Sequence, residues 1–218
     1  MPVKWEQFVG DDFFNLILVE PDQDQVKDIT KMYPAASIIP YALGDINGNA
    51  ILNITVAQSC SSILEPDAGA LSRFPVKEAF RVIDKVPVEI YRFDDLILKH
   101  KLDPPAFVKI DVQGYEYAVL NGFGEALDSV LCIELETHLV PIYKGEKSLT
   151  GINDFLNSKG FYLRHLETAG LFEGEVMEFN AYFVKRKKYL KGVNDKKLVR
   201  FWENVNRIPP ARRFLGSK

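Results

Sequence analysis

The chain is poor in cysteine and has no long apolar run. Its 218 residues include two cysteines, Cys60 and Cys132, and no Cys-x-x-Cys spacing, which argues against a disulfide framework and against a zinc site. No stretch of about 18 apolar residues occurs, so a membrane span is not expected. The first residues lack the basic-then-apolar order of a secretion signal. These absences predict a soluble, cytoplasmic protein.

Charge is distributed unevenly, although the formal net charge is only −3. From Lys185 onward the chain carries +10, and the residues before it carry −13. Such a tail can hold an anionic partner. The favoured interpretation is a solvated terminal helix that docks on the body through apolar side chains, namely Leu198, Phe201, Trp202 and Val205. Nucleic acid is not the expected partner, because the body is acidic and no base-reading motif is present.

Buried strands and helices alternate in the pattern of residues and predict an α/β fold. We expect parallel strands in the apolar runs 13–19, 36–43, 107–110 and 131–136. We expect helices over 23–32, with Asp22 as its cap, from 94 onward, and over 148–158. The runs 161–166 and 178–184 predict a terminal antiparallel strand pair. The expected architecture is therefore one doubly wound, mainly parallel sheet that ends in this pair.

Two segments depart from that alternation. Asn47-Gly48 is a strong hairpin signal, so we expect an antiparallel addition built from the flanking segments 42–43 and 51–56. Residues 57–75 show little periodicity and predict a long loop, which in a compact domain is usually functional or mobile.

The most informative segment is Phe107 to Gly122, in which an apolar strand leads into Asp111, then Gly114, then a helical pattern. A carboxylate in this position can bind a polar ligand, or it can cap the following helix. The segment by itself leaves both uses open. Glu20, Leu43 and residues 134–138 also lie at the carboxyl ends of strands, so we expect all of them along one edge of the sheet, where such folds bind ligands.

Six short motifs follow one another in a recognisable order: LVEPD at 18–22, ALGDINGNA at 42–50, CSSIL at 60–64, RFDDLI at 92–97, KIDVQGYEYAVLNG at 109–122 and CIELETH at 132–138. In combination they resemble the FkbM family of S-adenosylmethionine-dependent methyltransferases over roughly residues 15–185. The resemblance implies a Rossmann-like methyltransferase domain over 1–186, followed by a basic helical tail over 187–218. It also implies an O-methyltransferase that acts on a small molecule, at a hydroxyl of a sugar or secondary metabolite.

The resemblance assigns roles to single residues. Glu20 matches the acid that holds the ribose hydroxyls of S-adenosylmethionine, although it can also belong to a helix-start box. Ala42 and Leu43 match the segment beside the adenine, and Asp111 matches the acid near the reactive methyl. Methyl transfer also needs a group that takes up a proton, and Asp111 and His138 are the candidates. Glu134 and Glu136 are expected to point to opposite faces of their strand, so that at most one of them faces the cleft. Asp111 and one of these glutamates could hold a divalent metal, although the spacing requires none and no metal site is predicted.

One part of the family pattern is missing. Upstream of Asn15 we find neither a buried first strand nor the glycine-rich turn that approaches the cofactor. That strand lies between the Glu20 strand and the Asp111 strand, so two strand edges should lack partners. A segment further upstream, closure of the sheet or a strand from another copy can fill the gap, and the last leaves a homo-oligomer open. We favour an upstream segment and expect the chain as written to bind the cofactor weakly or not at all. The alternative is a non-catalytic binding or assembly module that keeps the fold.

Overall fold

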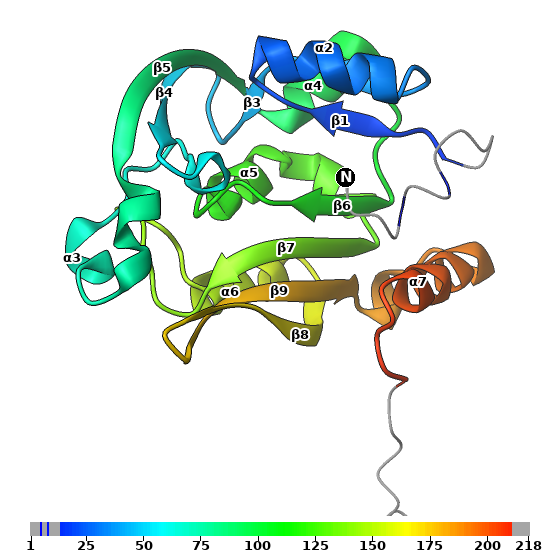
Figure 1. Cartoon of the computed structure of the whole chain (residues 1–218). Helices are drawn as coiled ribbons and strands as arrows, with labels where there is room; N and C mark the ends of the chain where they lie inside the picture. Colours follow the sequence, from blue (N-terminus) through cyan, green and yellow to red (C-terminus); the bar gives the residue numbers. More distant parts are fainter. Residues whose placement is uncertain (1–4, 6–7, 9–13, 211–218) are drawn as a thin grey trace, which may run out of the picture.

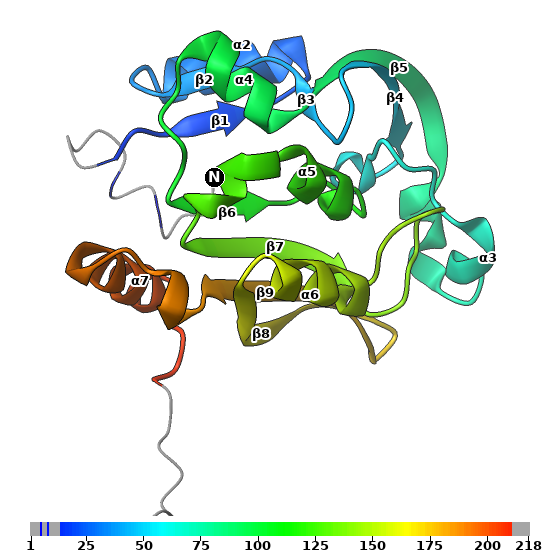
Figure 2. The same cartoon turned by 180° about the vertical axis from the view of Figure 1, so that it is seen from behind.

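The computed structural model describes residues 5, 8 and 14–210, and the strands in this part form three sheets (Figures 1 and 2). Strands β1 (Ile17–Val19) and β2 (Ser37–Ile39) pair in parallel. The second sheet has the order β3-β5-β4 and consists of β3 (Ala42–Leu43), β5 (Val82–Tyr91) and β4 (Gly48–Thr55). The third has the order β6-β7-β9-β8 and consists of β6 (Phe107–Ile110), β7 (Cys132–His138), β9 (Glu175–Lys185) and β8 (Phe161–Phe172).

Helices connect these strands and cover them. They are α2 (Gln23–Met32), α3 (Ala68–Leu71), α4 (Phe93–His100), α5 (Glu116–Gly122), α6 (Leu149–Ser158) and α7 (Val193–Val205), with short 3₁₀ turns at Gln58–Cys60, Pro75–Phe80, Gly124–Asp128 and Lys187–Tyr189. The cap predicted for α2 is confirmed, because the Asp22 carboxylate accepts from the backbone N–H groups of Asp24 and Gln25. No helix in the described part of the chain combines the length and the apolar character needed to cross a bilayer.

The third sheet confirms the predicted order of its elements. β6 and β7 are parallel, while β7 pairs antiparallel with β9 and β9 antiparallel with β8. The terminal antiparallel pair is longer than its apolar runs, because the polar residues between them continue both strands to a turn at Glu173-Gly174. β1, β6 and β7 all point the same way in Figure 1. Their carboxyl ends therefore lie at one side of the molecule.

The expectation of one doubly wound sheet is met only in part. The protein is α/β with parallel and antiparallel pairs, but β1 and β6 each pair with a single strand among the described residues. The predicted strand over 36–43 is also divided. Pro40 has no N–H to donate to a strand ladder, and the chain pairs with β1 before it and with β5 after it.

The predicted hairpin at Asn47-Gly48 is wrong in its partner. β4 does add antiparallel, but it pairs with β5, which separates it from β3. The Asn47 side chain explains the different path: its Oδ1 accepts from the N–H of Arg92 at 2.8 Å, and its Nδ2 donates to Asp95 at 2.6 Å. Asn47 therefore fastens this loop to the start of α4. The predicted long loop over 57–75 contains α3 and a 3₁₀ turn.

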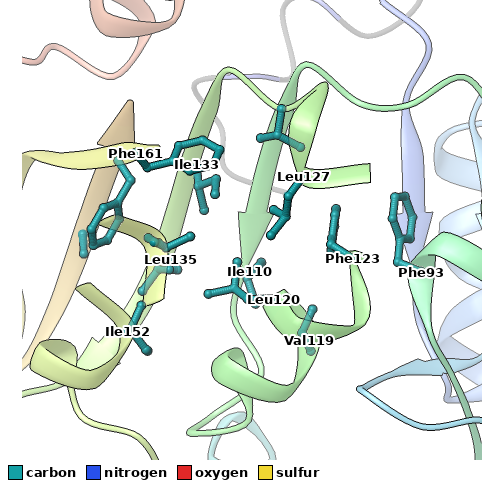
Figure 3. Close-up of a cluster of buried hydrophobic side chains, with 14 of the residues drawn as sticks. Phe93, Ile110, Val119, Leu120, Phe123, Leu127, Ile133, Leu135, Ile152 and Phe161 are labelled. Atoms are coloured by element: carbon teal, nitrogen blue, oxygen red, sulfur yellow. The ribbon is translucent and has the colours of Figure 1, made fainter. Parts of the chain in front are cut away.

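Figure 3 shows part of one large apolar cluster, against which Leu43 of β3 and Tyr91 of β5 also pack. It takes Ile39 from β2, side chains from the helices α4, α5 and α6, and Ile133 and Leu135 from β7. A second cluster attaches α7, whose Trp202 is 1% exposed and packs against Tyr182 of β9. The favoured interpretation of the tail as a docked helix is consistent with this packing.

Candidate functional site

The carboxyl end of β6 presents the carboxylate of Asp111, which is exposed at its tip. Its Oδ2 receives a hydrogen bond from Lys109 Nζ at 2.8 Å, and its Oδ1 receives a longer one from Gln113 Nε2 at 3.4 Å. Among the described contacts, Asp111 does not cap α5, whose first turn has no side-chain cap. The geometry therefore leaves the Asp111 carboxylate at the surface of the strand tip.

The turn after Asp111 is tight and has a fixed shape. Gln113 and Gly114 adopt positive φ angles of 52° and 89°, which are costly for a residue with a side chain. A Cβ atom at Gly114 would lie 2.8 Å from the Tyr143 ring, so glycine is also required for space. Below the turn, Glu116 Oε1 accepts from the backbone N–H groups of Val112 and Gly114 at 3.2 and 3.1 Å. Burial raises the pKa of Glu116 to about 7.

Glu136 of β7 lies beside this turn. In the parallel register Ile110 of β6 is level with Leu135 of β7. Asp111 and Glu136 are the residues that follow this pair, and they therefore lie side by side. Gln113 Nε2 donates to Glu136 Oε1 at 2.5 Å. Burial, then Glu178 and Asp111, raise the pKa of Glu136 to about 8, and the hydrogen bond from Gln113 opposes this rise. Glu134 and Glu136 lie two residues apart on β7 and therefore share one face, so the expectation of opposite faces is wrong. Glu134 is 4% exposed, and Glu136 is the one that reaches the strand tips.

His138 is enclosed at the end of β7, where it is 1% exposed. Its Nδ1 lies 2.7 Å from Glu146 Oε1, and Glu146 Oε2 accepts from the N–H groups of Ile142 and Tyr143. Burial lowers the pKa of His138, but the hydrogen bond and charge of Glu146 outweigh it, so the net change is upward. In this conformation the imidazole holds the 139–146 loop against β7.

Glu20 follows β1, which points the same way as β6, the strand that leads to Asp111 (Figure 1). Its Oε1 accepts from the N–H of Asp22 at 2.9 Å, which is the helix-start contact considered from the sequence. Burial raises its pKa. Ala42 is 7% exposed and Leu43 is half-buried, and both belong to β3 in a different sheet from β1 and β6.

The structure thus brings Asp111 and Glu136 together through Gln113 and encloses His138. The contact between Gln113 and Glu136 was not predicted from the sequence. The signal that could have predicted it is the register of β6 and β7, which makes Asp111 and Glu136 neighbours. Tyr143 is also new to the site: its hydroxyl lies 2.9 Å from Cys60 O and 3.1 Å from Gln113 Oε1, and these two acceptors share its one proton. Within the described ranges, no group of three or more His, Cys, Asp or Glu side chains is arranged to hold a metal.

A small hollow of ≈ 170 Å³ lies on the helical side of the molecule rather than at the strand tips. Ligand pockets for organic molecules usually enclose about 300–1,000 Å³, so this hollow is too small for a nucleoside. It is lined by Arg92, Leu120, Asn121, Gly124, Leu127, Phe155 and Lys159.

These features define an α/β protein with acidic side chains at the carboxyl ends of its parallel strands. A family model described as "Methyltransferase FkbM domain" matches residues 8–163. This is well over half of the chain and includes every residue predicted for the site. The chain therefore belongs to the FkbM methyltransferase domain family, which confirms the resemblance and indicates a methyltransferase. The comparison with curated proteins gave no match.

Proposed function

We propose that the protein is an S-adenosylmethionine-dependent O-methyltransferase that acts on a hydroxyl group of a sugar or secondary metabolite. The family assignment supports methyl transfer. The observation that carries the proposal is the position of two acids, Glu20 after β1 and Asp111 after β6, at the same side of the molecule. Open α/β folds bind nucleotides at this side.

Glu20 after β1 and the two residues of β3 suit the nucleoside part of the cofactor. Only Oε1 of Glu20 is engaged in the hydrogen bonds of the described residues, so Oε2 is available to accept from ribose hydroxyl groups. Leu43, which is half-buried, offers apolar surface for the adenine, whereas Ala42 is 7% exposed and lies beneath this surface. When bound, the cofactor supplies an electrophilic methyl group. The role of Asp111 is to orient the acceptor hydroxyl, since its carboxylate is exposed at the strand tip, whereas His138 is enclosed and hydrogen-bonded to Glu146.

Cofactor binding tests the proposal directly. We expect residues 1–218 to bind S-adenosylmethionine and S-adenosylhomocysteine weakly, with Kd on the order of 0.1–1 mM, because no strand joins β1 to β6 among the described residues. Ligand-observed NMR can measure this. Glu20→Ala should abolish binding, and the exposed Glu65 provides the matched control, Glu65→Ala.

Transfer of a labelled methyl group to hydroxyl acceptors is the second measurement, and Asp111→Asn should abolish it. Equal cofactor binding by wild type and Glu20→Ala would overturn the assignment of Glu20. Micromolar affinity would show that the missing pairing between β1 and β6 matters less for binding than proposed.

The second candidate is a non-catalytic module that keeps the fold. It is favoured by one observation, the lack of pairing between β1 and β6 in the described part of the chain. Absence of cofactor binding at millimolar concentration would favour this module over the enzyme.

A further inference from the structure

The side chain of Gln113 lies between three elements. It starts from the turn after β6, reaches Glu136 on β7, and contacts Tyr143 in the loop that follows β7. Carboxylates accept hydrogen bonds and cannot donate them when ionised. The amide nitrogen faces Glu136 and Asp111, and the amide oxygen faces the hydroxyl of Tyr143.

The backbone at Gln113 is held in a conformation that costs energy. Its φ of 52° lies in the left-handed region, which residues with a side chain rarely adopt. Such conformations persist where the surroundings fix them. Here Glu116 binds the N–H groups on both sides of Gln113, and the Tyr143 ring covers Gly114. The amide of Gln113 is thus directed at the two carboxylates by contacts of both its backbone and its side chain.

Two carboxylates at the same level of neighbouring strands repel each other unless something lies between them. The positive charge of Lys109 offsets the negative charge of the Asp111 carboxylate, with Lys109 Nζ 2.8 Å from Asp111 Oδ2. Gln113 Nε2 donates to the other carboxylate oxygen of Asp111, Oδ1, and to Glu136 Oε1. The ammonium group of Lys109 therefore lies beside Asp111. The amide of Gln113 lies between Asp111 and Glu136. Burial and the neighbouring carboxyl groups of Glu178 and Asp111 raise the pKa of Glu136.

We propose that Gln113 is a positioning residue of the methyl-transfer site, and that it holds Glu136 beside Asp111 so that Glu136 takes the proton of the acceptor hydroxyl. This inference rests on the proposed function, which supplies a sulfonium methyl donor. In the step, the acceptor oxygen forms a bond to the methyl carbon while the carbon–sulfur bond breaks and its electron pair stays on sulfur. The proton leaves the acceptor oxygen for Glu136 and then passes to water. Asp111 orients the hydroxyl.

The protonation of Glu136 reports on this arrangement. The groups that face it are the carboxyl groups of Glu178 and Asp111, the thiol of Cys60 and the amide of Gln113, with Lys109 and Tyr143 bound to its neighbours. Its carboxyl ¹³C resonance can be followed by NMR from pH 5 to 10 and assigned by its loss in Glu136→Gln. We expect a midpoint of about 8 in the wild type.

Gln113→Met keeps the length of the side chain and removes the amide. The midpoint of Glu136 should move up by about one pH unit, because a hydrogen bond to its charged form is lost. Gln25→Met is the matched control on the exposed face of α2 and should leave the midpoint unchanged. Tyr143→Phe keeps the buried ring and frees the amide oxygen of Gln113, so it should move the midpoint in the same direction by less. It also serves as the test if Gln113→Met does not fold.

Kinetics separate this inference from the proposed function. With any acceptor that is methylated, kcat should rise with pH through the Glu136 midpoint, and Gln113→Met should lower kcat at least tenfold while the acceptor KM changes little. An unchanged midpoint in both Gln113→Met and Tyr143→Phe would overturn the positioning role, whether or not the protein methylates anything. A shifted midpoint without methyl transfer by the wild type would overturn the proposed function and the proton-transfer role, and would leave the positioning of Glu136 standing.

Discussion

Glu116 shows how a single residue can link the stability of the strand tips to pH. Its side chain is 1% exposed, and its Oε1 accepts from the two backbone N–H groups that shape the turn after β6. Its Oε2 has no hydrogen-bond partner within the described residues. Burial raises its pKa from 4.5 to about 7, against the lowering effect of the backbone hydrogen bonds.

The direction of the pH effect follows from this shift. The folded protein holds the Glu116 proton more tightly than the unfolded chain does, so the contribution to stability is fully present below about pH 4.5 and is lost as the pH rises to about 7. The full difference is about 3 kcal/mol. Glu136, with its pKa of about 8, acts in the same direction over a higher range.

We predict that Glu116→Gln flattens the dependence of stability on pH. The free energy of unfolding of the wild type should fall between pH 5 and pH 8, and that of Glu116→Gln should fall by about 2–3 kcal/mol less. Urea denaturation at both pH values measures this. Glu125→Gln, at an exposed position, should behave as the wild type. An unchanged pH dependence in Glu116→Gln would mean that Glu116 is ionised when folded.

The sequence predicts which residue types lie at the strand ends, but it does not predict how their side chains pair. Asp111 and Glu20 follow apolar runs, and their placement needs only the strand direction. The enclosure of His138 depends on Glu146, which reaches it from a loop eight residues away whose path no local pattern determines. The contact between Gln113 and Glu136 depends on the register of two strands separated by α5.

At the scale of elements, α5 and the loop after β3 approach each other at backbone distance. A Cβ atom at Gly122 would lie 1.8 Å from the carbonyl oxygen of Gly44. Gly44 in turn donates its N–H to Tyr91 O at 3.0 Å at the end of β5. The glycine at the end of α5 therefore lets the sheet of β3, β5 and β4 lie close to the helix that follows β6.

We predict opposite effects for two glycine-to-alanine changes in helices. Gly122→Ala should lower the free energy of unfolding by more than about 2 kcal/mol, because α5 and the loop at Gly44 must separate. A Cβ atom at Gly151 in α6 meets only the Lys147 side chain, at 3.7 Å. Gly151→Ala should therefore raise the free energy of unfolding by about 0.5–1 kcal/mol. Urea denaturation compares the two. Tolerance of Gly122→Ala would show that the two elements do not approach so closely.

Elements with strong local signals were predicted well. α2 has its predicted bounds and cap, β6 has its predicted bounds, and α6 follows its apolar spacing. The pairing of β4 was not predictable, because its partner β5 begins 27 residues after β4 ends and its apolar residues fit either neighbour. The break at Pro40 could have been predicted from the missing N–H of proline.

At the scale of the molecule, hydrogen bonding and packing divide the chain differently. The strands form three separate sheets in the described residues, yet one apolar cluster includes side chains of all three. The cluster that holds α7 lies around Cys132 and Val184, at the end of β7 opposite to His138. The C-terminal helix and the strand-tip site are therefore at opposite ends of the same strands.

We predict that α7 contributes to stability without affecting the strand tips. Trp202→Ala should lower the free energy of unfolding by about 3–5 kcal/mol, because Trp202 is 1% exposed and packs against Tyr182. Leu198→Ala, at a side chain that is 37% exposed, should cost less than about 1 kcal/mol. Circular dichroism during urea denaturation measures both, and the NMR midpoint of Glu136 should stay the same in both. A loss below about 1 kcal/mol for Trp202→Ala would mean that α7 does not dock in solution. A moved Glu136 midpoint would mean that the two ends of the sheet are coupled, because the shared strands would then transmit the loss of packing to the site.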